Sequence, residues 1–439
     1  MALEDELVVE ITKSKAKPDA APAEPNPPKE AYAKINEFVI KKLDHTSQTT
    51  KNVTDLRGFF TNVDVYEDLF GVYRSCNIGI IDSQNLQQNL PISAGDIIKF
   101  VWTIPGNDKD AELEMCVYDF TSTVPHGANG AVMYGIKCCS KVLFQDNRAK
   151  TLSRSVKGTC SEVALAIFNE NYSQYSKMTV VNSKNEAVTV IPNLTPMQTI
   201  SFLTSFATPT DEDIPSYVVY EDRDEFIFAP ITKMLLKEPF KELYYEPNLH
   251  QITDIARRRL CVIKLESRVR DNYLMLGAMR LFTNNNLIYD PVTKQVIVNK
   301  QGYSGTNTTQ KPVSDLNEST STHDTVIQGT NNYNQGELSA NEYAVRSIKT
   351  RMAYFMNLYN NSLLMTIPGS PEYEIGQVIK LHIAGGVSNN RRLEGNWLIT
   401  GIHHNISQLE YVCNVEMCRD SNPEELSGSD INQNRNISC

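Results

Sequence analysis

Short runs in which apolar and polar residues alternate dominate the first third of the chain. Turns rich in Pro, Gly, Asn and Asp separate them. The runs occupy residues 63–66, 72–81, 96–104, 113–120 and 132–144. Alternation places successive side chains on opposite faces of a strand. Several such strands in a row predict a small antiparallel β-barrel or sandwich over residues 44–150.

Four other segments carry apolar residues at spacings of three and four, which predicts amphipathic helices. They are residues 31–43, 161–171, 195–206 and 339–361. In the third segment Pro196 stands in the first turn, where a missing N–H costs nothing. Because helical and strand-like patterns alternate over residues 151–250, we expect a mixed α/β domain there.

Two segments carry too few apolar residues to pack a core. Residues 14–31 are rich in Pro, Ala and Lys, and residues 302–336 consist largely of Asn, Thr, Ser and Gly. Such compositions favour an extended or irregular chain. We therefore expect an N-terminal arm within residues 1–43 and a polar surface loop at residues 301–338.

One pattern occurs twice along the chain. The segment LPISAGDIIKF at residues 90–100 resembles SPEYEIGQVIKL at residues 370–381, and residues 133–139 are echoed by residues 411–418. In both segments a glycine and a polar residue precede an apolar strand, which predicts a tight turn. The turn residues are Gly95, Asp96, Gly376 and Gln377.

This duplication predicts a second β-barrel in the C-terminal part of the chain. Its first part and an extension are expected at residues 251–300, and its remaining strands at residues 362–425, before a tail at residues 426–439. Three copies of a chain with two similar barrels would present six similar modules around one axis. Such a trimeric ring could join a six-fold partner to a three-fold one.

Charge and composition exclude several classes of protein. The net charge is −10, from 42 Lys and Arg against 52 Asp and Glu, which argues against binding nucleic acid by counterion release. A negative surface would instead let nucleic acid pass without sticking. No apolar run is long enough to span a bilayer, and the acidic N-terminus lacks the features of a secretory signal. We expect no membrane insertion, and assembly in the cytoplasm.

The residues that most often carry catalysis or metal binding have structural interpretations here. The chain has nine cysteines and no C-x-x-C motif, and pairs such as Cys138 with Cys139 and Cys413 with Cys418 lie in strand-like runs, so we expect reduced core residues. His403 and His404 are adjacent and would point to opposite faces of a strand. Nucleophile-elbow, H-E-x-x-H, P-loop and dinucleotide motifs are absent from the sequence. We expect no enzyme, no cofactor and no metal.

Residues 217–231 (YVVYEDRDEFIFAPI) resemble a segment of the central hub proteins of contractile phage tail baseplates, in which an extended strand ends in an acidic turn. The helix that contains Pro196 precedes it, and residues 263–290 and 363–404 follow in the order of that family. The resemblance covers about residues 59–420 and extends to late-control proteins and the hub part of VgrG-type spikes. It implies an α+β fold, mostly β, with two similar small antiparallel β-barrels and an α/β insertion domain in a trimeric ring.

The same resemblance implies a structural role in the virion tail baseplate. The hub would join the hexameric tail tube to the trimeric central spike, contact other baseplate subunits, and leave a channel through which DNA passes without specific binding. Because the chain ends soon after the second predicted barrel, we expect the spike to be a separate chain.

Two other interpretations stay open. A β-rich tail adhesion protein would expose aromatic clusters on loops, whereas Trp102 and Trp397 lie inside predicted strands, which favours core packing. A cell-wall hydrolase would need two carboxylates that face each other across a cleft. The closely spaced acidic pairs instead indicate solvated strand faces or turns; they are Asp222 with Asp224 and Glu112 with Glu114.

Overall fold

The structure is a computed structural model of the whole chain. It describes residues 33–43, 50–84, 86, 92–104, 110–121, 123–126, 130–184, 186–205, 207–212, 214–223, 225–246, 252, 254–267, 283–290, 294–302, 323–328, 351, 354–355, 358, 361–383 and 393–420. The predicted Pro-rich arm and the C-terminal tail at residues 426–439 lie outside these ranges.

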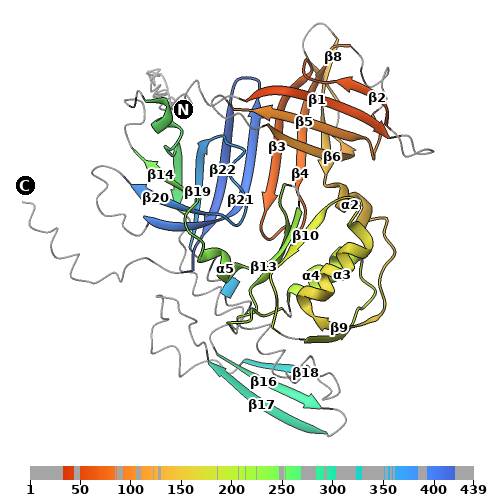
Figure 1. Cartoon of the computed structure of the whole chain (residues 1–439), viewed down its shortest axis with the longest axis vertical. Helices are drawn as coiled ribbons and strands as arrows, with labels where there is room; N and C mark the ends of the chain where they lie inside the picture. The colour runs from red at the N-terminus through yellow and green to blue at the C-terminus, as the bar shows by residue number, and fades with distance from the viewer. Residues whose placement is uncertain are drawn as a thin grey trace, which may run out of the picture.

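The protein is mostly β, and fourteen strands form one large sheet (Figure 1). The N-terminal strands are β1 (Lys34–Leu43), β2 (Thr50–Asp55), β3 (Phe60–Asp68), β4 (Ser75–Asp82), β5 (Ile97–Thr103), β6 (Ala111–Phe120), β7 (Val124–His126) and β8 (Ala131–Cys139). The others are β14 (Lys241–Tyr245), β15 (Lys264–Ser267), β19 (Ser362–Pro368), β20 (Val378–Ile383), β21 (Gly395–Ser407) and β22 (Tyr411–Cys418).

The order of this sheet joins the two regions in which barrels were predicted. It runs β15-β19-β22-β21-β3-β4-β8-β6-β5-β1-β2, with β20 and β14 branching from β21 and with β7 beside β8. All neighbours are antiparallel except β14 and β20. The two regions meet where β3 pairs with β21. One core lies along the whole sheet, because inward residues of both regions, among them Phe38, Val63, Trp397 and Ile406, are buried together.

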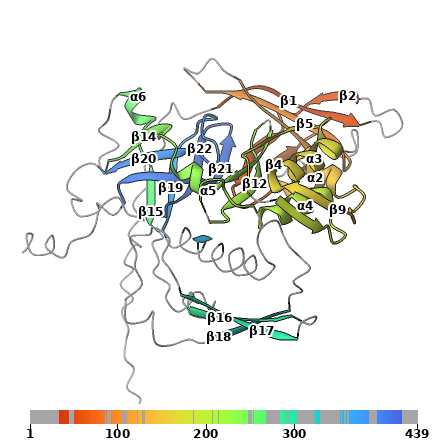
Figure 2. The ribbon, with the colours of Figure 1, turned by 60° about the horizontal axis from the view of Figure 1, so that its bottom comes forward.

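The middle of the chain forms a smaller α/β unit with its own core. Its helices are α2 (Lys141–Asp146), α3 (Cys160–Tyr172) and α4 (Pro196–Thr204). The short helices α5 (Ile231–Leu235) and α6 (Ile255–Arg258) follow, and Ile231 and Met234 of α5 are buried in the core of the large sheet. The strands of the α/β unit are β9 (Ser155–Thr159), β10 (Lys177–Val180), β11 (Glu186–Val190), β12 (Tyr217–Glu221) and β13 (Glu225–Pro230). Both views show α2, α3 and α4 gathered on one side of the molecule (Figures 1 and 2).

The two helices predicted in this unit are confirmed. Helix α3 begins with a capping box between Thr159 and Glu162. Helix α4 begins with a second capping box, between Thr195 and Gln198, and has Pro196 in its first turn as predicted. Of the helix predicted at residues 339–361, the structure describes Arg351, Tyr354, Phe355 and Leu358 as helical; most of the remainder lies outside the described residues.

The helix predicted at residues 31–43 is wrong, because this segment forms strand β1. Its apolar residues satisfy helical spacing and strand alternation equally well. Pairing with β5 on one side and β2 on the other decides between them, and it buries Phe38 and Ile40 completely. The predicted strand at residues 132–144 is also too long, since Ser140 caps helix α2 after Cys139.

Part of the predicted loop at residues 301–338 is ordered as a strand. Strand β18 (His323–Gln328) pairs in parallel with β16 (Thr283–Asp290), and β16 pairs with β17 (Gln295–Gly302). The short run DTVI within β18 contains two adjacent apolar β-branched residues, Val326 and Ile327, which favour a strand within the polar tract. These three strands form a separate sheet, seen at the bottom of Figure 2, and the rest of the predicted loop lies outside the described residues.

Candidate functional site

The turn at Gly95 connects to strand β6 through two backbone hydrogen bonds. The Gly95 N–H donates to the Val117 carbonyl over 2.8 Å, and the Val117 N–H donates to the Asp96 carbonyl over 2.9 Å. Gly95 has φ of 96°, a conformation that L side chains rarely adopt. The Asp96 carboxylate also accepts the Ser93 N–H over 2.8 Å, which closes the turn.

The turn at Gly376 makes the same bonds to strand β21. The Gly376 N–H donates to the Ile399 carbonyl over 3.0 Å, and the Ile399 N–H donates to the Gln377 carbonyl over 2.9 Å. Gly376 has φ of 77°. The Gln377 side-chain oxygen accepts the Glu374 N–H over 3.3 Å, in the position that the Asp96 carboxylate takes in the first turn.

The strands that follow the two turns also correspond in register. In β6 the pairing with β8 shifts between Val117 and Asp119. In β21 the pairing with β22 shifts between Ile399 and Gly401. We call β3 to β8 the first strand unit, and β15 with β19 to β22 the second. The pairings match β4 with β19, β5 with β20, β6 with β21, β8 with β22 and β3 with β15.

Replacing Gly376 with valine is expected to destabilise the second strand unit by about 1–3 kcal/mol, because its φ is positive. An added Cβ would also lie 2.8 Å from the Tyr220 hydroxyl. The equivalent Gly95→Val change should carry the same backbone cost, because the φ of Gly95 is also positive. Thermal unfolding of both variants measures these effects, and two unchanged melting temperatures would refute the role assigned to the turns.

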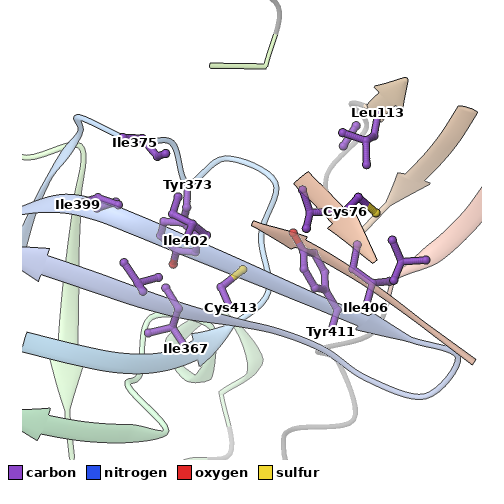
Figure 3. Packing of buried hydrophobic residues seen from close by; sticks show 14 of the residues in the cluster. Cys76, Leu113, Ile367, Tyr373, Ile375, Ile399, Ile402, Ile406, Tyr411 and Cys413 are labelled. Carbon is purple, nitrogen blue, oxygen red and sulfur yellow. The ribbon is translucent and has the colours of Figure 1, made fainter. Parts of the chain in front are cut away.

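The junction between the units is the β3–β21 pair. Inward residues of both strands are almost or fully buried, including Val63, Ile402 and Ile406. Figure 3 shows that side chains of the two units lie close together there, with Cys76 near Tyr411 and Ile406. Because both strands contribute to one apolar core, the junction is a permanent part of the fold.

The outward side of the same junction is polar. Asp64 of β3 accepts hydrogen bonds from Asn405 over 2.6 Å and pairs with His403 over 2.8 Å. The His403 ring stacks on Tyr66, with 4.4 Å between ring centroids. Burial raises the pKa of Asp64, but the bonds from His403 and Asn405 outweigh that effect and leave this pKa below its usual value.

This polar face continues over the strands on both sides of the junction. By register, its side chains include Lys264, Glu266, Thr366, Asn414, Glu416, His403, Asn405, Asn62, Asp64, Tyr66, Asp68, Ser75, Asn77, Lys137 and Asp119. Five of these are carboxylates and two are lysines. The same registers also place Leu364, Val412 and Met133 on this side, so the face is mostly polar and its charged residues are mainly acidic.

His403 and His404 point to opposite sides of β21, as predicted. His404 is buried, and its Nδ1 lies 2.9 Å from the Tyr411 hydroxyl and 3.1 Å from Cys413 Sγ. Burial lowers the pKa of His404 to about 3 and raises the pKa of Cys413 to about 12. A neutral thiol and a neutral imidazole without solvent access do not make an activated nucleophile.

The acidic turn after β12 contacts both strand units. The Glu221 carboxylate accepts the Arg74 N–H over 3.0 Å, between β3 and β4 of the first unit, and the Ser140 hydroxyl over 2.7 Å, at the N-terminus of α2 directly after β8. Arg223 reaches the second unit, where it donates to the Tyr373 carbonyl over 3.3 Å and lies 3.5 Å from Glu374. The segment that the sequence singled out therefore contacts both units through partly buried polar and charged groups.

Burial raises the pKa of Glu221 to about 7, above its ordinary value of 4.5. The folded chain therefore keeps a proton that the unfolded chain releases, so this group's contribution to stability is complete below about pH 4.5 and is lost as the pH rises through 7. A Glu221→Gln variant cannot titrate. Relative to wild type, its free energy of unfolding should rise by on the order of 2 kcal/mol between pH 4.5 and pH 8, which denaturant titrations at both pH values measure. An unchanged difference would contradict the raised pKa.

Other predicted residues have structural roles. Trp102 and Trp397 are buried in β5 and β21, as expected. The eight described cysteines are free and buried, which confirms the prediction of reduced core residues for them. Glu114 pairs with Lys41 and Lys141. Asp222 lies in the acidic turn, and Asp224 lies outside the described residues.

Sequence patterns missed two parts of this site. The alternation of Asn62, Asp64 and Tyr66 in β3 could have revealed an outward polar face, but only the pairing with β21 shows that the face continues. Arg74 carries no local signal, since its partners Glu67 and Glu221 come from other elements. No helix in the described part of the chain is both long and apolar enough to cross a membrane.

Two solved structures match this architecture over nearly their whole length. The prophage MuSo2 43 kDa tail protein from Shewanella oneidensis gives a TM-score of 0.53 at 12% identity, over 88% of this chain and 98% of that one. The tail protein from Neisseria meningitidis MC58 gives a TM-score of 0.52 at 10% identity, over 88% and 97%. The chain has a phage tail-protein fold. No protein-family model and no curated protein matches the sequence.

A third match, to a Francisella PdpA-VgrG complex, has a TM-score of 0.48 and 10% identity, and covers 90% of this chain and 59% of that one. At that score the likeness does not establish a shared fold. At the identities of the first two matches, the tail-protein fold is shown and function is not, because one fold hosts many functions.

Proposed function

We propose that the chain is the structural hub of a contractile-tail baseplate. Three copies form a ring with pseudo-six-fold symmetry, which joins the hexameric tail tube on one side to the trimeric central spike on the other and contacts further baseplate subunits. In this role the protein belongs to the virion tail, is assembled in the host cytoplasm, and performs no catalysis.

The observation that carries this proposal is the repeat of the strand unit. The two units share the glycine turn, the two backbone bonds at that turn and the register shift in the next strand. Two similar units in each of three chains provide six similar surfaces for a six-fold partner, while the whole ring keeps three-fold symmetry for the spike. The tail-protein fold supports the same reading.

The polar face suits the wall of a channel for DNA. Its five carboxylates outnumber its two lysines, and one of these, Lys137, is paired with Asp119 over 2.8 Å. A wall of this charge repels phosphates, so DNA passes without being held. Because the face crosses the junction without interruption, both strand units would contribute equally to the channel.

Electron microscopy of the purified full-length chain, alone and with co-expressed spike candidates, tests the proposal. We expect three-fold class averages with six similar densities around an open centre, and three spike chains per ring. A filament, or a monomer, that does not bind tail proteins and does bind glycans would instead indicate a tail adhesion protein.

A further inference from the structure

The edge of β21 that pairs with β3 has a counterpart in the first strand unit, on β6 and β7. Up to Leu398, β21 pairs with β20, and from Gly401 to Ser407 the same edge of β21 pairs with β3. In the first strand unit, β6 pairs with β5 up to Cys116. Beyond Val117, β6 and β7 have no strand on that edge in the described part of the chain. Among the described residues, the edge that receives β3 in the second unit therefore has no strand partner in the first.

The match between the two strand units also identifies the strand that would pair with this edge. Strand β15 takes the place of β3, since β3 pairs with β4 and β15 pairs with β19. β15 is the last strand in the order of the large sheet as described. The chain thus contains one internal junction, β3–β21. The strands that correspond to its two sides, β15 and β6–β7, lie at the two ends of the eight strands that carry the polar face.

We propose that β15 of one copy pairs antiparallel with the β6–β7 edge of the next copy and repeats the geometry of the β3–β21 junction. This inference rests on the proposed ring. Three such contacts would alternate with the three internal junctions and close the eight strands that carry the polar face around the axis, so that β15 and the β6–β7 edge are no longer exposed to unrelated strands.

The register of the proposed contact follows from strand β8. In the first unit, Val124 lies opposite Met133 and His126 lies opposite Ala131. In the second unit, Asn405 lies opposite Val412 of β22, and the Ser407 N–H donates to the Glu410 carbonyl across the next turn. Val124 therefore corresponds to Asn405, and His126 to Ser407. Since Asn405 lies opposite Asp64 and Ser407 opposite Asn62, the predicted partners of Val124 and His126 are Glu266 and Lys264 of the neighbouring copy.

The side chains at the two edges fit this arrangement. Val63 and Ile406 are fully buried at the internal junction, and their counterparts are Leu265, which is partly buried, and Pro125, which is exposed. Val124 is 49% exposed beside Met133, which is 41% exposed. In the ring, the neighbouring copy would cover the exposed Val124, and Leu265 of one copy would pack against Pro125 of the next. Pro125 has no N–H to donate, so this edge discourages pairing with unrelated strands.

Directed disulfide formation tests the register. A Val124→Cys/Glu266→Cys variant of the full chain places one thiol on each edge. Opposed Cα atoms in antiparallel strands lie about 4.5–5.5 Å apart, within the range for a disulfide. Diamide oxidises the two thiols to a disulfide and takes up their two protons and two electrons. We expect loss of the monomer band and appearance of dimers and trimers on non-reducing gels, reversed by a thiol reductant.

The matched control is Val124→Cys/Ser267→Cys, in which the second thiol moves one residue and points to the opposite face. It should remain monomeric on the same gels, as should wild type, whose described cysteines are buried. Light scattering of each sample before oxidation separates the possible failures. A trimer that does not cross-link, or that cross-links equally in the control, would contradict the proposed register. The proposed trimeric ring would not be contradicted by that result. A monomer without cross-links overturns both.

Discussion

Replacing Arg74 with methionine is expected to destabilise the folded chain by about 3–5 kcal/mol. The Arg74 side chain is 7% exposed and lies 2.7 Å from the Glu67 carboxylate, which is 2% exposed. It also donates to the Arg223 carbonyl over 3.3 Å, and its own N–H binds Glu221. Methionine fills a similar volume but leaves the Glu67 charge buried without its cation. Denaturant unfolding at neutral pH measures the loss.

The control for this variant is Arg57→Met. Arg57 pairs with Asp55 over 2.6 Å, but both side chains are about half exposed, so solvent screens the pair and its loss should change stability far less than the loss of Arg74. Equal effects of the two substitutions would show that burial of the Arg74 network contributes nothing, and would contradict its role in holding the strand units to the acidic turn.

Replacing Gly369 with alanine is expected to cost about 3 kcal/mol through overpacking. Gly369 follows β19, and its N–H donates to the Tyr411 carbonyl over 2.9 Å. An added Cβ would lie 2.2 Å from Cγ of the Tyr411 ring. That ring is fully buried and bound to His404, so it has no free space to enter. Thermal unfolding should therefore shift strongly to lower temperature.

Gly58→Ala provides the matched comparison, because a Cβ there would meet nothing within 4 Å. Its melting temperature should stay close to that of wild type, since surface substitutions usually change stability by less than about 0.5 kcal/mol. If Gly369→Ala melted like Gly58→Ala, the close packing of Tyr411 against the backbone would be contradicted.

Local patterns in the sequence predicted those elements whose cause is local. The capped helices α3 and α4 are examples, since Thr159 and Thr195 cap them from adjacent residues. The glycine turns are a second example: Gly95 and Gly376 both have positive φ, a conformation that glycine adopts at no steric cost. Opposite orientations of His403 and His404 follow from strand geometry alone.

Features that depend on partners far along the chain could not be predicted in this way. Strand β1 satisfies helical spacing, and only β5, about 60 residues later, makes it a strand. The β3–β21 junction joins residues more than 330 positions apart. The hydrogen bond from the Arg74 N–H to the Glu221 carboxylate likewise depends on tertiary packing, because it joins residues 147 positions apart.

The most direct test of the proposed hub is the native mass of the purified full-length chain, determined by light scattering over a range of concentrations. Three chains of 49.4 kDa give about 148 kDa, and the ring predicts this mass for the chain alone or for each ring in a three-to-three complex with its spike. A monomer of 49.4 kDa that stays monomeric in the presence of tail tube and spike proteins would contradict it.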